Sequence, residues 1–220
     1  MPRKAVFLDK DGTIVPETGG RIADPNAQPV PGAVPAIRKL RDAGFLIVVV
    51  TNQAAVARGF FTESDLAAAH TALLDRFAAA GAPIDAIYYC PHLPDGSVPQ
   101  YAVECDCRKP KPGLLLRAAQ ELDIDLAASY LIGDAERDAQ AAQAAACKGI
   151  AIIQPDLRSA LTLDVGTIWF SGRSPWQQVA DQLDDAAGPA VFVIVPDITE
   201  AADWVLEMEN AETTEETPDD

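Results

Sequence analysis

The chain has 220 residues, 49% of them hydrophobic, and a formal net charge of −16 at pH 7. This length is ample for one hydrophobic core and predicts a single domain over residues 1–209. The negative charge argues against a protein that binds duplex nucleic acid, because such proteins carry a basic face. No apolar run approaches the roughly 20 residues of a membrane helix. The basic start reaches Asp9 too early for a signal peptide, so we expect a cytoplasmic protein without a membrane partner.

Short apolar runs rich in β-branched residues alternate with helical patterns as far as Ile153. This alternation predicts βαβ units and a three-layer, Rossmann-like α/β fold with a mostly parallel sheet. The expected strands are Ala5–Leu8, Phe45–Thr51, Ala86–Tyr89, Tyr130–Ile132 and Ile150–Ile153. The expected helices are Val34–Leu40 (ending near Gly44), a capping-box start at Thr62–Asp65 that runs to about Gly81, Leu114–Leu122, and Arg137–Ala146.

The pattern weakens after Gln154, and we treat residues 154–195 as a divergent elaboration. Strands are expected at Thr167–Phe170 and Val191–Val195, and helices at Trp176–Leu183 and Glu200–Met208. These elements could extend the sheet or form a small appendage. Seven carboxylates and no basic residue follow from Glu207 onward, so residues 210–220 are predicted to form a disordered acidic tail.

Carboxylates follow two of the predicted strands, at the ends where parallel α/β sheets bind their ligands. Asp9 and Asp11 follow the first strand, and one could be a nucleophile that also binds Mg²⁺ while the other acts as general acid and base. Gly12 would allow a sharp turn. Asp134 and Asp138 lie one helical turn apart, which suits a metal ligand and a supporting carboxylate. Each motif alone is also compatible with an ordinary turn after a strand.

Two other segments could bind a phosphate group. Thr51, Asn52 and Gln53 end a buried strand and offer a hydroxyl and amides to phosphate oxygens, although a strand-end cap would explain them as well. Arg108 and Lys109 lie just before a proline, where a buried lysine could balance carboxylates and a phosphate. A solvated basic loop is the alternative.

Three of the four cysteines are close together in the sequence and have a histidine beside them. Cys90 and His92 are followed by Cys105 and Cys107, which gives three thiolates and one imidazole, the preferred set for structural Zn²⁺. With four protein ligands, no position remains for a catalytic water, so the metal would pin a loop that lacks its own core. Cys147 ends an alanine-rich helix and is expected in the core.

The order Asp-x-Asp-Gly-Thr, Thr-Asn, Lys-Pro and Gly-Asp-x-x-x-Asp at successive strand ends resembles the haloacid dehalogenase superfamily of phosphotransferases. With the zinc loop, the chain looks like the D-glycero-D-manno-heptose 1,7-bisphosphate 7-phosphatases within it. The resemblance extends from about Ala5 to Ala146, with a further fragment at Ala201–Leu206. It is carried by FLDKDGTI, VVVTNQAAVARGFFTE, IYYCPHLPDGSV, CDCRKPKPGLLLRAA and ASYLIGDAERDAQAA.

The resemblance implies a phosphoric monoester hydrolase that removes the C7 phosphate of a heptose bisphosphate through an aspartyl-phosphate. Asp9 would attack phosphorus, and Asp11 would serve as acid and then as base. Thr51 and Lys109 would stabilise the transferring group. Mg²⁺ would be held by the Asp9 carboxylate, the Asp11 main-chain carbonyl and Asp134, with Asp138 supporting them. The implied substrate-binding positions are Glu17, Thr18, Gly19, Gly20, Asn52, Gln53, Ala54 and Arg108.

The intervals between the motifs imply an enzyme without a cap domain, since Asp11 and Thr51 are too close for a large insertion. The zinc loop and the loop from Glu17 to Asn26 would then shape the pocket of a monomer that binds a small sugar phosphate. One departure from the family lies at Ala135, where relatives often carry a lysine that reaches the substrate.

Three other functions remain open. Histidinol-phosphate phosphatases share the zinc pattern, but Ala57–Gly59 favours the heptose group. The polynucleotide 3′-phosphatase domain shares the Thr-Asn-Gln segment, yet it lacks the Cys/His set and needs a basic face. An inactive, zinc-pinned scaffold is the non-enzymatic alternative. The presence of every catalytic carboxylate argues against it.

Overall fold

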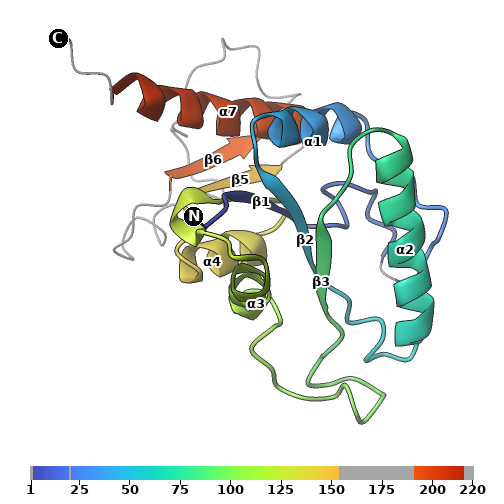
Figure 1. The fold of residues 1–220 in the computed structure, drawn as a ribbon. Coiled ribbons are helices and arrows are strands. Elements are labelled where there is room, and N and C mark those ends of the chain that lie inside the picture. Colours follow the sequence, from blue (N-terminus) through green and yellow to red (C-terminus); the bar gives the residue numbers. More distant parts are fainter. Residues whose placement is uncertain (1, 20, 154–190, 216–220) are drawn as a thin grey trace.

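The computed structural model describes residues 2–19, 21–153 and 191–215. At its centre is a six-stranded parallel sheet in the order β3-β2-β1-β4-β5-β6 (Figure 1). The strands are β1 (Ala5–Leu8), β2 (Leu46–Asn52), β3 (Ala86–Cys90), β4 (Tyr130–Gly133), β5 (Gly149–Ile153) and β6 (Val191–Val195). The predicted parallel sheet is confirmed, and the last predicted strand extends it beside β5.

Strand β1 forms the middle of the sheet, and all four of its residues are buried. Its residue Leu8 lies beside Val49 of β2 on one side and beside Ile132 of β4 on the other. Unbroken apolar runs predict this position, because a strand covered by helices on both faces has no polar alternation.

Helices cover both faces of the sheet and give three layers (Figure 1). One face packs against α1 (Ala33–Asp42), α2 (Glu63–Ala79) and α7 (Ile198–Glu215). The other packs against α3 (Gly113–Leu122) and α4 (Glu136–Ala144), and a 3₁₀ helix at Leu126–Ala128 precedes β4. Cys147 is buried in the second core, as expected.

Local sequence signals explain where several helices begin and end. Thr62 accepts a hydrogen bond from the Asp65 amide and donates its own amide to the Asp65 carboxylate, so the predicted capping box is present. Gly44 follows α1 with φ of 87°, the left-handed conformation that favours glycine after a helix. Helix α4 ends earlier than predicted because Ala146 adopts a left-handed φ of 57°.

The order of the strands indicates where a ligand site lies. The chain runs from β1 through β2 to β3 in one direction, and from β4 through β5 to β6 in the other. The carboxyl ends of β1 and β4 therefore lie at the point where the strand order reverses, which is where open α/β sheets bind ligands.

One region differs from the sequence-based expectation, and two other predicted elements lie outside the residues that the structure describes. Helix α7 continues to Glu215, so residues 210–215 of the predicted disordered tail are helical. The predicted elements Thr167–Phe170 and Trp176–Leu183 lie outside the described residues.

Within 2–19 and 21–153, no further domain is inserted between β1 and α3. No helix among the described residues is both long and apolar enough to span a bilayer.

Candidate active site

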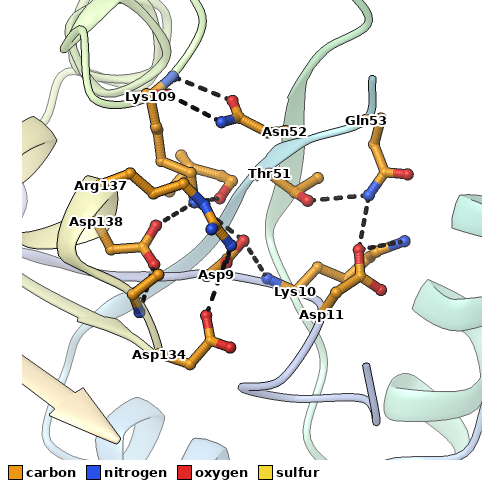
Figure 2. Close-up of polar contacts among 12 residues, drawn as sticks. Asp9, Lys10, Asp11, Thr51, Asn52, Gln53, Lys109, Asp134, Arg137 and Asp138 are labelled. Atoms are coloured by element: carbon orange, nitrogen blue, oxygen red, sulfur yellow. Dashed lines mark hydrogen bonds and ion pairs between the residues drawn. The ribbon is translucent and has the colours of Figure 1, made fainter. Parts of the chain in front are cut away.

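Polar side chains converge at the carboxyl ends of β1, β2 and β4 (Figure 2). Asp9 and Asp11 follow β1, Thr51 lies near the end of β2, and Asp134 follows β4 directly. Lys109 reaches them from the loop before α3. Segments far apart in the sequence thus bring five of the predicted catalytic and metal-binding side chains to one place.

Lys109 is fully buried between carboxylates. Its Nζ lies 2.9 Å from Asp9 Oδ1 and 2.5 Å from Asp138 Oδ1, and it donates to the Val50 carbonyl at 2.7 Å. Burial opposes the lysine charge, but Asp9 and Asp138 together outweigh burial and raise the pKa of Lys109. The alternative of a solvated basic loop is therefore wrong for this residue.

Asn52 holds the main chain of Lys109 in place. Its Nδ2 donates to the Lys109 carbonyl at 3.0 Å, and its Oδ1 accepts from the Lys109 amide at 3.0 Å. Asn52 was predicted to line the substrate site, and it does line the cavity. Because both of its amide atoms are used in these bonds, however, its main role in the structure is to position the lysine.

Three carboxylates form a group that fits a divalent cation. Asp9, Asp134 and Asp138 each offer one oxygen, and these oxygens lie within 4.8 Å of one another. Such oxygens are the ligands that Mg²⁺ prefers. Burial, together with the charges of Asp9 and Asp138, raises the pKa of Asp134 to about 6. A divalent cation would relieve this crowding of negative charge.

Asp11 lies on the other side of Asp9, next to polar partners. The Gln53 amide donates to Asp11 Oδ2 at 2.9 Å and to Thr51 Oγ1 at 3.0 Å. Lys10 Nζ lies 3.3 Å from the same carboxylate oxygen. Burial outweighs these contacts and raises the pKa of Asp11, which favours a carboxyl group that can carry a proton to a leaving group.

The site opens into a cavity of about 310 Å³. Three arginines, Arg58, Arg108 and Arg137, lie on its walls. The other lining residues are Asp9, Asp11, Glu17, Gly19, Thr51, Asn52, Gln53, Ala54 and Ala55. Cations facing carboxylates suit a phosphorylated ligand, because the arginine fork matches phosphate oxygens.

One of the predicted substrate-binding residues lies elsewhere, and another is not described by the structure. Thr18 lines a neighbouring cavity of about 280 Å³, which Lys10 and Asp11 also border. Gly20 lies outside the described residues.

Arg137 is the residue that the sequence analysis missed. Its guanidinium approaches Asp9 and Asp134 at 3.7 and 3.8 Å. Arg137 follows Asp134 by three residues and lies in the first turn of α4, but Asp134 precedes that helix, so the spacing alone does not direct the guanidinium toward the carboxylates.

One cluster, at the end of β3 and in the loop that follows it, contains Cys90, His92, Cys105 and Cys107. The Sγ atoms of Cys90 and Cys105 are 3.6 Å apart, and His92 Nδ1 lies 3.7 Å from Cys90 Sγ and 3.3 Å from Cys107 Sγ. These spacings approach the roughly 3.7 Å edges of a tetrahedron with zinc–sulfur bonds of about 2.3 Å. The hydrogen bond between the two thiol groups lowers the pKa of Cys107 and raises the pKa of Cys90, so a thiolate is favoured at Cys107.

Comparison with known proteins places the chain among phosphatases. Residues 17–146 match the model of the haloacid dehalogenase-like hydrolase family. D-glycero-beta-D-manno-heptose-1,7-bisphosphate 7-phosphatase of Yersinia pestis is 47% identical over 141 residues, covering 64% of this chain and 75% of that protein. The Pasteurella multocida protein of the same name is 39% identical over 152 residues, covering 69% and 82%. A structure of D,D-heptose 1,7-bisphosphate phosphatase from B. bronchiseptica, complexed with magnesium and phosphate, matches with a TM-score of 0.68 and 30% identity, covering 93% and 99%.

Proposed function

The chain belongs to the haloacid dehalogenase-like hydrolases, and we propose that it is an Mg²⁺-dependent phosphatase that removes the C7 phosphate of D-glycero-D-manno-heptose 1,7-bisphosphate. The observation that carries this proposal is the pairing of Asp9 with the buried Lys109 at the switch point of the sheet, next to Asp11 and a cavity with three arginines.

In the first step, an Asp9 carboxylate oxygen attacks the C7 phosphorus, and the bond from phosphorus to the sugar oxygen breaks. Asp11 gives its proton to that oxygen, which leaves as an alcohol. Lys109 and the Thr51 hydroxyl offset the charge on the transferring group. The raised pKa of Asp11 supports this role, because the carboxyl must be protonated when the step begins.

In the second step, Asp11 takes a proton from a water molecule that attacks the phosphorus of the aspartyl-phosphate. The bond from Asp9 to phosphorus breaks, inorganic phosphate leaves, and Asp11 is protonated for the next turnover. Mg²⁺, held by the carboxylates of Asp9 and Asp134 and the Asp11 carbonyl, would neutralise phosphate charge throughout. Asp138 supports the site through Lys109.

The cysteine cluster is proposed to hold a structural Zn²⁺ ion. Four protein ligands leave no place for substrate, so the metal would serve the loop alone. Arg108 follows Cys107 directly and donates to the His92 carbonyl at 3.3 Å. The zinc loop thereby places an arginine on the cavity wall, where it can bind the phosphate that does not react.

The experiment is a phosphate-release assay with both anomers of the heptose bisphosphate and with histidinol phosphate, followed by ³¹P NMR of the products. We expect the C7 phosphate to disappear while the anomeric phosphate remains. Faster cleavage of histidinol phosphate would contradict the substrate, whereas no release from any of the three would contradict the phosphatase itself.

Arg108→Ala should raise KM for the bisphosphate much more than for a small phosphate ester that has no second phosphate.

The proposal also includes a cytoplasmic monomer without a nucleic-acid or membrane partner. The strongly acidic composition favours a monomer and disfavours binding to nucleic acid. Sedimentation analysis tests the oligomeric state.

A further inference from the structure

Arg137 lies in an unusual position between two carboxylates. It is in the first turn of α4, and one guanidinium nitrogen, Nη2, is 3.7 Å from Asp9 Oδ2 and 3.8 Å from Asp134 Oδ1 (Figure 2). The other Asp9 oxygen, Oδ1, is bound by Lys109 and by the Lys10 amide. Arg137 therefore faces the oxygen of Asp9 that Lys109 leaves available.

At these distances the Arg137 guanidinium attracts both carboxylates but forms no tight hydrogen bond with them, because such a bond needs a donor–acceptor distance of about 3.2 Å or less. The Arg137 side chain is 44% exposed and lines the cavity, so it has room to turn. Arg58 and Arg108 line the same cavity, but among the described residues neither forms an ion pair with a carboxylate. Arg137 alone of the three lies against the group that would hold the metal.

A guanidinium and a divalent cation repel each other, so a cation bound to Asp9 and Asp134 disfavours this position of Arg137. We propose that Arg137 neutralises Asp9 and Asp134 in the metal-free enzyme and turns into the cavity to bind the substrate's phosphate once the cation has replaced it. The inference rests on the proposed function, because that function places Mg²⁺ between these carboxylates. Arg137 then couples metal binding to phosphate binding.

The test measures binding, with Mn²⁺ as the metal probe and inorganic phosphate as the anion. In Arg137→Gln, Mn²⁺ titrated without phosphate and followed by electron paramagnetic resonance should bind about threefold to tenfold more tightly than in wild type, because a nearby positive charge is gone. Phosphate titrated calorimetrically at saturating Mg²⁺ should bind about tenfold more weakly, through the loss of a charged hydrogen-bond donor.

Two further variants are controls. Arg117→Gln removes an exposed arginine of α3 that pairs with Glu121, and should change neither affinity. Arg137→Lys keeps the charge and should keep Mn²⁺ affinity near that of wild type.

Unchanged Mn²⁺ affinity in Arg137→Gln would overturn the proposal. Tighter Mn²⁺ binding with unchanged phosphate binding would overturn its second half and leave Arg137 as a partner of the carboxylates only. If wild type and Arg117→Gln also fail to bind Mn²⁺, the metal site of the proposed function is wrong, and the proposal falls with it.

Discussion

Gly12 is needed for two reasons that can be separated by experiment. Its φ is 83°, and a Cβ atom at this position would overlap the Asp134 carboxylate. Gly44 has a similar φ of 87° but open space around it. Gly44→Ala should therefore cost only the backbone strain, about 1–2 kcal/mol, and keep activity.

Gly12→Ala should in addition displace Asp134 and weaken Mg²⁺ binding and phosphate release together. Denaturant unfolding and metal titration of both variants provide the comparison. Equal activity in the two would show that the close approach to Asp134 does not matter.

His70 makes stability depend on pH. Its ring packs against Tyr89, and burial, with a smaller effect from Lys10, lowers the pKa of His70 to about 4. The unfolded chain takes up this proton near pH 6.5, whereas the folded protein resists it. The contribution of neutral His70 to the free energy of unfolding is therefore fully present above about pH 6.5 and is lost as the pH falls toward 4. At pH 5 the loss amounts to about 2 kcal/mol.

His70→Gln removes the titration and should flatten the dependence of unfolding free energy on pH between 7 and 5. Denaturant titrations at fixed Mg²⁺ concentration measure the difference between the two slopes. Identical slopes would mean that folding does not shift the pKa of His70.

At the scale of elements, the loop between β3 and α3 connects the cysteine cluster to the active site. We expect about one zinc per chain in protein purified without a chelator. Cys107→Ser should lose zinc, and KM for the bisphosphate should rise because Arg108 follows directly. Cys147→Ala changes a core cysteine and should keep zinc.

Elemental analysis and limited proteolysis of the loop distinguish these variants. Wild-type protein without zinc would contradict the structural metal site, and unchanged proteolysis in Cys107→Ser would show that the loop is ordered without it.

At the scale of the whole molecule, α7 ties the end of the described chain to the sheet. Glu209 accepts from Lys4 at 2.8 Å, Lys148 at 2.7 Å and the Tyr130 hydroxyl at 2.9 Å. Glu209→Gln should destabilise the protein by about 1–3 kcal/mol, since it weakens charged hydrogen bonds at a partly buried position.

Glu207→Gln, on the exposed side of the same helix, should have little effect, and removal of residues 216–220 should be tolerated. Urea denaturation measures all three. If Glu207→Gln lowered the free energy of unfolding as much as Glu209→Gln does, the effect would come from the overall charge of the helix.

Much of this arrangement follows from short-range patterns. Apolar runs predict the buried strands, and residues that follow such runs must meet at one edge of a parallel sheet, so Asp9, Thr51 and Asp134 could be assigned to one site. Arg137 was missed because its direction depends on where α4 begins. The use of both Asn52 amide atoms depends on a loop 57 residues away, which no local pattern reveals.

The extent of α7 was underestimated for a related reason. The composition of residues 210–215 suggests disorder, but packing of the preceding helix and the contacts of Glu209 allow the helix to continue.

The most direct test of the account is phosphate release by Asp9→Asn, compared with Asp75→Asn, which changes an exposed residue of α2 in the same way. Circular dichroism of both variants verifies that they fold. We expect Asp9→Asn to release no phosphate above background from the heptose bisphosphate, because the substitution removes the proposed nucleophile and a proposed metal ligand together, while Asp75→Asn should match wild type. Turnover near the wild-type rate in folded Asp9→Asn would contradict the aspartyl-phosphate mechanism.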